Sequence, residues 1–175
     1  MKLKKTLLIS LFSFTLIGCT HTAYAVTDQE KLTQGLRLYE QGDHKQAIQI
    51  LGDLAKSGNA DAQFEVAQIL HRAHKWEWGA YWYLKAAKNG HRKAQNRVGK
   101  LYSHGDAGLP FNTKESIKWL EKAAEKGDNL GYQYDLAMAY RDKDNAKAVK
   151  LFKKLCKVNY GISCSELEYY KKYAN

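Results

Sequence analysis

Proline is nearly absent from this sequence, and no apolar run is long enough to span a membrane. The 175 residues include one proline and thirteen glycines. A composition so poor in chain-breaking residues excludes a collagen-like or low-complexity chain and favours one ordinary globular domain. The apolar run Thr6–Gly18 has thirteen residues, whereas a membrane-spanning helix needs about 20.

The motifs of common enzymes are missing as well. The sequence has no G-x-S-x-G, S-x-x-K, G-x-x-x-x-G-K-(Ser/Thr) or H-E-x-x-H pattern, which argues against a serine acylase, a phosphate-binding loop and a zinc protease. His71 and His74 are three residues apart, with His91 and His104 in nearby joints. Spacing fixes no third ligand, so we interpret these histidines as solvated rather than metal-binding. We expect no enzymatic activity, no metal and no cofactor.

The amino terminus has the layout of an export signal. Met1–Lys5 is basic and Thr6–Gly18 is apolar, as in a signal peptide. Two processing sites compete. The segment LIGC at 16–19 resembles a bacterial lipobox, which would end the signal peptide at residue 18 and lipidate Cys19; AYA at 23–25 is an A-x-A site, which would end it at residue 25. We favour the lipobox, because cysteine is scarce and Cys19 ends the apolar run.

Either site predicts export. Residues 19–27 would then form a tether and residues 28–175 the folded domain. With the lipobox, we expect a periplasmic protein anchored to the outer membrane, and the lipid at Cys19 would be its only link to the membrane. With the other site, the protein would be soluble in the periplasm or secreted.

The chain is basic. Its formal net charge is +10, and because the leader holds Lys2, Lys4 and Lys5 and no acidic residue, +7 remains without it. Such a charge favours acidic proteins, anionic lipid headgroups or other polyanions, although an ordinary solvated basic surface is the alternative. Nucleic acid is not an expected partner, because acids are interspersed among the basic residues, no nucleic-acid-binding module is recognised and export removes the target.

Four copies of one pattern organise the rest of the chain. Two are strong, WYLKAAKNG at Trp82–Gly90 and WLEKAAEKG at Trp119–Gly127; two are weaker, at Ile50–Gly58 and Leu151–Asn159. Aligning their last residues gives steps of 32, 37 and 32 residues. A repeat of about 20–50 residues indicates a solenoid. Glycine suits a helix stop because the stop commonly has a positive φ, and asparagine is the substitute that this position tolerates best.

Apolar spacing between these stops predicts helices. We expect Asp28 to cap a first helix at 29–40, and a return helix at 45–56 to bury Ala47, Ile48 and Leu51. The second unit starts a helix at Ala60 and has another at 76–88. The third and fourth units, 92–127 and 129–159, repeat this layout, and a last helix at 163–173 would cap the stack.

Cys156 and Cys164 are predicted to form a structural disulfide. They are eight residues apart, and an exported protein meets an oxidising compartment. We expect Cys156 in the last turn of one helix and Cys164 in the first turn of the next. A redox or metal role is disfavoured, because no C-x-x-C motif or cluster of further ligands accompanies the pair.

The repeated residues resemble the Sel-one-like repeat (SLR), a relative of the tetratricopeptide repeat. The resemblance covers about residues 28–173 and is strongest in the two central units. Its elements are A-x-A-Q-x-x-x-(Gly/Ala), Y-x-x-G…G-(Leu/Val)-P and W-(Tyr/Leu)-x-K-A-A-x-x-G. They stand here as Ala60/Ala62/Gln63/Ala67, Ala94/Gln95/Gly99, Tyr102/Gly105/Gly108/Leu109/Pro110 and the two strong stretches above.

The resemblance implies an all-α, right-handed solenoid of about four helical hairpins with a C-terminal capping helix. The second unit departs from the pattern, because it lacks the G-x-x-G-(Val/Leu)-P joint. The family implies a binding scaffold rather than one chemistry.

A basic stripe is the first candidate binding surface. The concave side of such a solenoid is normally lined by the first helix of each pair. Equivalent positions in those helices include Asp61/Lys93, Glu65/Arg97/Asp135 and Gln68/Lys100/Met138. Lys93, Arg97 and Lys100 make the third unit locally basic, with Arg72 and Arg92 near it. We interpret this stripe either as a groove for an acidic segment or as an ordinary solvated face, the latter being the simpler reading.

Aromatic residues offer a second candidate. Trp82 and Tyr83 match core positions of the repeat, but Trp76, Trp78 and Tyr81 are not all required there. Exposed tryptophan beside charge is typical of interface anchors. Packing inside or between repeats is the interpretation that we favour for these three residues, and exposure is the alternative.

The function expected from these features is that of an exported scaffold or adaptor that binds another protein of the cell envelope. The basic charge favours an acidic partner. One alternative is a periplasmic immunity or inhibitor protein that blocks a toxin or an enzyme. A second alternative, a cell-wall-active hydrolase, is disfavoured by the missing motifs.

Overall fold

The computed structural model describes residues 26–173, and within that range the secondary structure is nine α-helices without a strand. The helices are α1 (Asp28–Glu40), α2 (His44–Lys56), α3 (Ala60–Arg72), α4 (Trp76–Lys88), α5 (Arg92–His104), α6 (Thr113–Ala124), α7 (Leu130–Tyr140), α8 (Asn145–Lys157) and α9 (Ile162–Tyr173). They form four hairpins and a final helix, as predicted. The predicted signal peptide, Cys19 and most of the tether lie outside the described residues.

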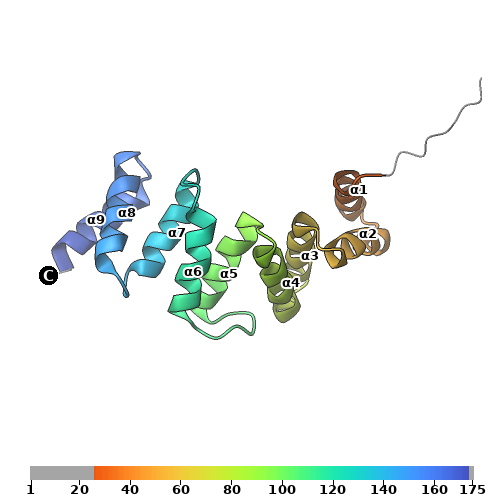
Figure 1. Cartoon of the computed structure of the whole chain (residues 1–175), viewed down its shortest axis with the longest axis horizontal. Helices are drawn as coiled ribbons and strands as arrows, with labels where there is room; N and C mark the ends of the chain where they lie inside the picture. Colours follow the sequence, from red (N-terminus) through yellow and green to blue (C-terminus); the bar gives the residue numbers. More distant parts are fainter. Residues whose placement is uncertain (1–25, 174–175) are drawn as a thin grey trace, which may run out of the picture.

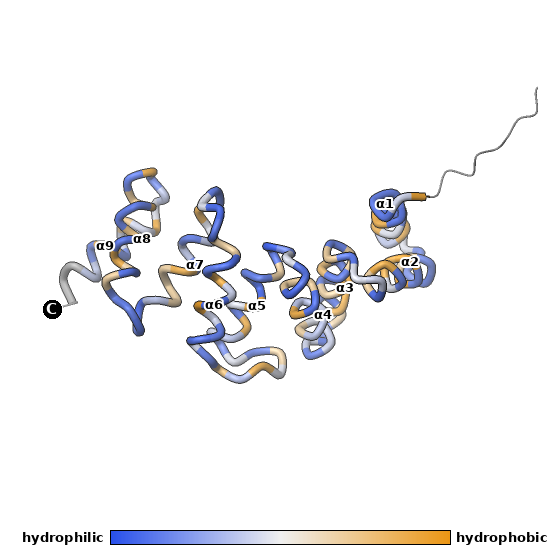
Figure 2. The backbone as a smooth tube through the Cα atoms, in the orientation of Figure 1, coloured by the Kyte–Doolittle hydropathy of each residue, from blue (hydrophilic) through white to orange (hydrophobic). Residues whose placement is uncertain are grey.

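The hairpins stack in sequence order (Figure 1). Each helix packs mainly against the helix before it and the helix after it, and α5 also touches α7. The buried side chains form three consecutive clusters along the stack, centred on α1–α3, α3–α6 and α6–α9. Figure 2 shows the hydrophobic colour mainly where helices face one another. The molecule is therefore an elongated α-solenoid, which confirms the predicted fold class.

The predicted stop residues end the second helix of each hairpin with positive φ angles. These angles are 102° at Gly58, 88° at Gly90, 67° at Gly127 and 56° at Asn159. A positive φ costs glycine little and asparagine less than most other residues. The asparagine at the fourth stop is thus explained by the backbone conformation.

Buried glutamines join consecutive hairpins. Nε2 of Gln63 donates to the carbonyl of Ala55 at 2.9 Å, and Nε2 of Gln95 donates to the carbonyl of Ala87 at 3.2 Å. Gln133 repeats the contact at the carbonyl of Gly127, at 2.9 Å. Each bond adds a side-chain donor to a carbonyl at or just beyond a helix end, where the regular hydrogen-bond pattern of the helix stops. The repeated A-x-A-Q element therefore connects each hairpin to the one before it.

A close helix crossing explains one glycine of the resemblance. A Cβ added at Gly99 would lie 2.5 Å from Cγ of Leu120 and 3.2 Å from the carbonyl oxygen of Ser116. Any larger residue at this position of α5 would push α6 away. The small residue therefore sets how closely the third hairpin closes.

The C-terminal end is closed by α9 and by a disulfide. Cys156 and Cys164 are bonded, with their Cα atoms 4.8 Å apart, across the turn from α8 to α9. Leu167 and Tyr170 of α9 are buried in the last core cluster. Both the predicted disulfide and the predicted capping helix are confirmed.

Two local predictions are wrong. Thr27, not Asp28, caps α1: its hydroxyl accepts from the backbone N–H of Glu30, whose carboxylate accepts from the backbone N–H of Thr27. This reciprocal capping box satisfies two donors, which Asp28 alone would not. Ile48 is 55% exposed, because it lies off the buried face of α2, which consists of Ala47, Leu51, Leu54 and Ala55.

Candidate functional site

The first helices of the second, third and fourth hairpins are joined by polar contacts. Nη2 of Arg97 on α5 donates to Nε2 of His71 on α3 at 2.8 Å. Toward α7, Nδ2 of Asn96 donates to Oδ2 of Asp135 at 2.8 Å, and Nζ of Lys100 lies 3.5 Å from Oδ1 of the same carboxylate. Arg97 and Lys100 therefore lie on one surface with α3 and α7, as the stripe predicts.

This surface is mixed in charge rather than purely basic. Lys93 is exposed and Lys100 is paired with Asp135. Burial raises the pKa of Glu65, while Arg72 and Lys93 oppose that rise. Among the described carboxylates, none lies within ion-pair distance of Lys93 or Arg97. These two cations are available to an acidic group of a partner.

Two basic residues near the predicted stripe have other contacts. The guanidinium of Arg72 lies 5.4 Å from the ring centroid of Tyr39, toward α1. Arg92 donates two hydrogen bonds to Asp128, at 2.9 and 2.5 Å, and two to the carbonyl of Ala123. Bidentate arginine–carboxylate contacts hold their geometry well. Arg92 therefore connects α5 to the end of α6.

A recess continues the surface beyond Lys100. It is an open hollow of about 410 Å³ between α5, α6 and α7. Its apolar wall includes Leu120, Met138 and the ring of Phe111, which is 70% exposed. Its lining residues are Lys100, Ser103, His104, Phe111, Thr113, Ser116, Leu120, Tyr134, Asp135, Met138, Ala139, Arg141 and Asp142. A hollow with an apolar wall and a charged rim suits a side chain that has both an apolar part and a polar or charged group.

Ser116 adds an unpaired polar group to this recess. The side chain of Ser116 is fully buried, and its Oγ has no hydrogen-bond partner among the described residues. Buried hydroxyls are nearly always hydrogen-bonded. The hydroxyl is therefore a candidate partner for a group that enters the recess.

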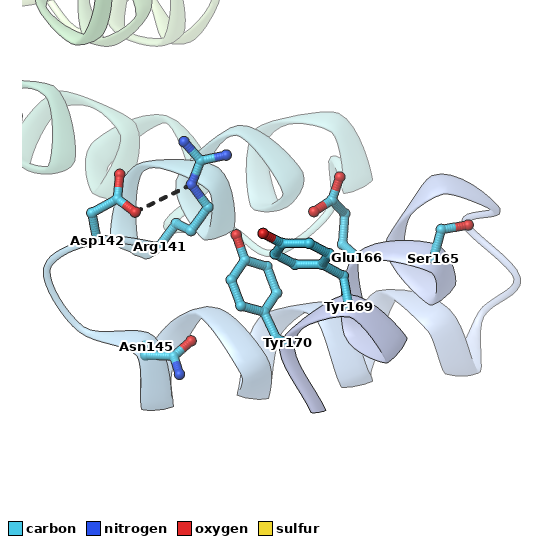
Figure 3. Close-up of a pocket in the computed structure, with 7 residues that line it drawn as sticks. All are labelled: Arg141, Asp142, Asn145, Ser165, Glu166, Tyr169 and Tyr170. Carbon is cyan, nitrogen blue, oxygen red and sulfur yellow. Dashed lines mark ion pairs between the residues drawn. The ribbon is translucent and has the colours of Figure 1, made fainter. Parts of the chain in front are cut away.

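A second recess lies next to the first, under the capping helix (Figure 3). It is an open hollow of about 790 Å³ lined by Arg141, Asp142, Asn145, Ser165, Glu166, Tyr169 and Tyr170. Arg141 and Asp142 line both hollows, and Nε of Arg141 lies 3.4 Å from Oδ1 of Asp142. Figure 3 shows the tyrosine rings beside Arg141. The surface thus extends from Arg97 to α9; we call it the α5–α9 surface.

The three aromatic residues at the start of α4 are exposed, contrary to the packing interpretation. Trp78 is 64% exposed, and Trp76 and Tyr81 are also exposed. They lie off the buried face of α4, whereas Tyr83 is buried and Trp82 is partly buried in the core. His71 connects this group to the stripe, because its ring centroid lies 4.5 Å from that of Trp76.

Two histidines, His71 and His91, are partly buried, contrary to the prediction that they are solvated. His71 is half-buried, and burial followed by the charge of Arg97 lowers its pKa. Nδ1 of His91 accepts from the backbone N–H of Ala94 at 3.1 Å, and its ring stacks on Phe64 at 4.3 Å. Burial lowers the pKa of His91, while Asp61 opposes the shift. Both rings act as neutral acceptors.

In the part of the chain that the structure describes, no three His, Cys, Asp or Glu side chains gather as metal ligands. Within residues 26–173, no helix is long and apolar enough to cross a bilayer.

Both recesses were missed from the sequence. Ser116 and Phe111 belong to α6 and to the joint before it, and no motif distinguishes them. The unusual length of the third unit, 37 residues against 32 in its neighbours, was the available signal, because the extra residues build the joint that places Phe111.

A family model described as Sel1 repeat matches three consecutive segments of the chain, residues 79–91, 92–128 and 129–160. These segments include α5 to α8 and nearly all of α4. No curated protein matches the chain in sequence.

Solved structures give the same result for the fold. The chain is similar to a Sel1 repeat protein from Oxalobacter formigenes, with a TM-score of 0.70 and 22% identity over 82% of this chain and 45% of that one. It is also similar to a protective antigen present in uropathogenic Escherichia coli strains that displays an SLR fold, with a TM-score of 0.66 and 25% identity over 82% of this chain and 33% of that one. The chain thus spans less than half the length of either.

A third similarity is weaker. A MamA structure from Desulfovibrio magneticus RS-1 has a TM-score of 0.52 and 16% identity, covering 77% of this chain and 76% of that one. Together these structures establish an SLR-type solenoid.

Proposed function

We propose that this chain binds another protein through its α5–α9 surface. Residues 79–160 match the Sel1 repeat. Such repeats generally mediate protein–protein interaction, and their scaffold is typically non-catalytic. The recess between α5, α6 and α7 is the observation that carries the proposal. Lys100 lines it, one helical turn from Arg97, and it holds both an apolar wall and the unpaired hydroxyl of Ser116.

The chemistry of the surface describes the segment that it would bind. An apolar side chain of the partner fits against Phe111, Leu120 and Met138, where its burial is favourable by about 25 cal/mol per Å². An acidic residue next to it would meet Lys93 and Arg97. The partner therefore presents an apolar anchor with at least one carboxylate nearby.

The test compares two charge reversals of equal size. The double variant Arg97→Glu with Lys100→Glu should lower capture of the native partner at least about tenfold, because buried interface charges without partners cost about 2–5 kcal/mol. The control is Lys88→Glu with Lys126→Glu, two exposed positions near the ends of second helices. Equal capture by both variants, with unchanged circular dichroism, would remove the α5–α9 surface from the proposal.

We further propose that the scaffold acts in the cell envelope, anchored by a lipid at Cys19. The signal-like leader supports export. The bonded pair Cys156–Cys164 supports an oxidising compartment. The variant Cys19→Ser should release the protein from the membrane fraction, and a mature chain that begins at Val26 would show instead that the other site is used.

A further inference from the structure

Apart from Ala146 in the first turn, the exposed residues of α8 are all lysines. Lys150, Lys153, Lys154 and Lys157 are all exposed and follow the spacing i, i+3, i+4 and i+7, which places them on one face of the helix. Lys147 is close to the same face and is paired with Asp144 at 3.3 Å. Helix α8 contains no acidic residue. We call this group of five the lysine face.

The lysine face is not neutralised by its neighbours. Among the residues whose side chains the structure describes, no carboxylate lies within ion-pair distance of the four lysines from 150 to 157. Helices α7 and α9 pack on the opposite side of α8, through buried Ala148, Phe152 and Leu155. Like charges at these spacings destabilise a helix, and an anionic surface would relieve their repulsion.

Two apolar side chains extend this face at its carboxyl end. Val158 is 55% exposed and Ile162 is 62% exposed, on either side of the turn from α8 to α9. Figure 2 shows the hydrophobic colour at this turn, at the upper left of the molecule. The Cys156–Cys164 bond closes the same turn. A rigid turn therefore presents two aliphatic side chains directly beyond a row of lysines.

We propose that the lysine face and this turn form a contact site for an anionic phospholipid surface. Lysine is depleted at protein–protein interfaces, where arginine and aromatic residues are enriched, and the face holds neither. Clustered lysines are instead attracted to anionic headgroups, and exposed aliphatic side chains can enter the boundary between headgroups and acyl chains. The site lies on the lysine face of α8, whereas the α5–α9 surface takes only Asn145, the first residue, from that helix, so the protein can hold both partners.

Vesicle co-sedimentation tests the proposal. The purified full chain should partition onto vesicles of phosphatidylglycerol and phosphatidylcholine far more than onto phosphatidylcholine alone, and high salt should remove the difference. Replacing Lys150, Lys153 and Lys154 by Gln should lower partitioning onto the anionic vesicles at least about tenfold. The variant Val158→Ser with Ile162→Ser should also lower it, although the charge is unchanged.

The matched control replaces Lys114, Lys118 and Lys126 by Gln and removes the same charge from another part of the stack. All proteins share residues 1–25, so the leader contributes equally to each. A control that loses as much binding as the α8 variant would overturn the proposal, since net charge would then suffice. Binding of the lysine face to polyglutamate but not to anionic vesicles would also overturn it and would assign the face to an acidic protein.

Discussion

His91 supplies one of the hydrogen bonds that start α5, and it can do so only as a neutral ring. Its Nδ1 accepts from the backbone N–H of Ala94, so a proton on Nδ1 would replace the acceptor with a donor. Asn59 and Asn129 occupy the corresponding positions before α3 and α7, and their side-chain oxygens accept in the same way. The cap of α5 is therefore lost when an imidazole is protonated, whereas the caps at Asn59 and Asn129 do not titrate.

This difference predicts a pH effect on stability. The pKa of His91 is lowered from 6.5 in the folded chain by burial, so the unfolded chain binds the proton more readily. The contribution of His91 to the free energy of unfolding is thus complete above about pH 6.5 and is lost as the pH falls through the folded pKa. Loss of a cap costs about 1 kcal/mol.

The variant His91→Asn keeps a cap without a titrating group. Urea unfolding above and below pH 6.5 should show that this variant loses less stability on acidification than the natural chain. His71 has a lowered pKa too, so part of the pH dependence should remain in the variant. An identical loss in both proteins would contradict the assigned role of His91.

At the scale of helices, α4 begins without a side-chain cap. Lys75 holds the N-cap position and makes no capping hydrogen bond, and a positive charge at this end opposes the helix dipole. Asp43 caps α2 and Asp144 caps α8 from equivalent second-helix positions. The uncapped turn also holds the exposed Trp76 and Trp78.

Replacing Lys75 by Asp should therefore stabilise the chain. A cap is worth about 0.5–2 kcal/mol, and we expect the midpoint of thermal unfolding to rise. Lys88→Asp is the control, because it places the same new charge at the other end of α4, where the dipole makes it unfavourable. If the unfolding midpoint of Lys75→Asp were lower than that of the natural chain, Lys75 would have to make a stabilising contact that outweighs the new cap.

The disulfide restrains the last two helices. Replacing both Cys156 and Cys164 by Ser should cost about 2.5 kcal/mol in the chain-entropy model for so short a loop. Because each helix depends mainly on its neighbours, hydrogen exchange should increase in α8 and α9 and remain unchanged in α3 and α4. Uniform acceleration along the chain would instead indicate that the stack unfolds as one unit.

The features that the sequence predicted are those that local chemistry determines. The stops at Gly58 and Asn159 were predictable because a positive φ restricts the residue type, and the disulfide because of its spacing. Exposure of Ile48, Trp76 and Trp78 was not predictable, since it depends on which face of each helix the neighbouring helices cover. The recess lined by Ser116 depends on the approach of three helices, which no single stretch of sequence encodes.

On the scale of the whole molecule, contacts run from each helix to the next, so binding surfaces must be assembled from several hairpins. The α5–α9 surface takes residues from five helices, α5 to α9, and from the joint that carries Phe111. The lysine face belongs to α8 alone. A rigid stack that presents both sites can hold a protein partner at a fixed orientation to the anionic phospholipid surface proposed for the lysine face.

Site-specific photo-cross-linking in the native cell tests the central claim most directly. A photoreactive residue at His104, on the rim of the recess, should form an adduct with one protein, and Arg97→Glu with Lys100→Glu in the same chain should abolish that adduct. The same residue at Lys88, exposed at the end of α4, should form none. An adduct at Lys88 but not at His104, or one at His104 that survives the charge reversal, would contradict binding through the α5–α9 surface.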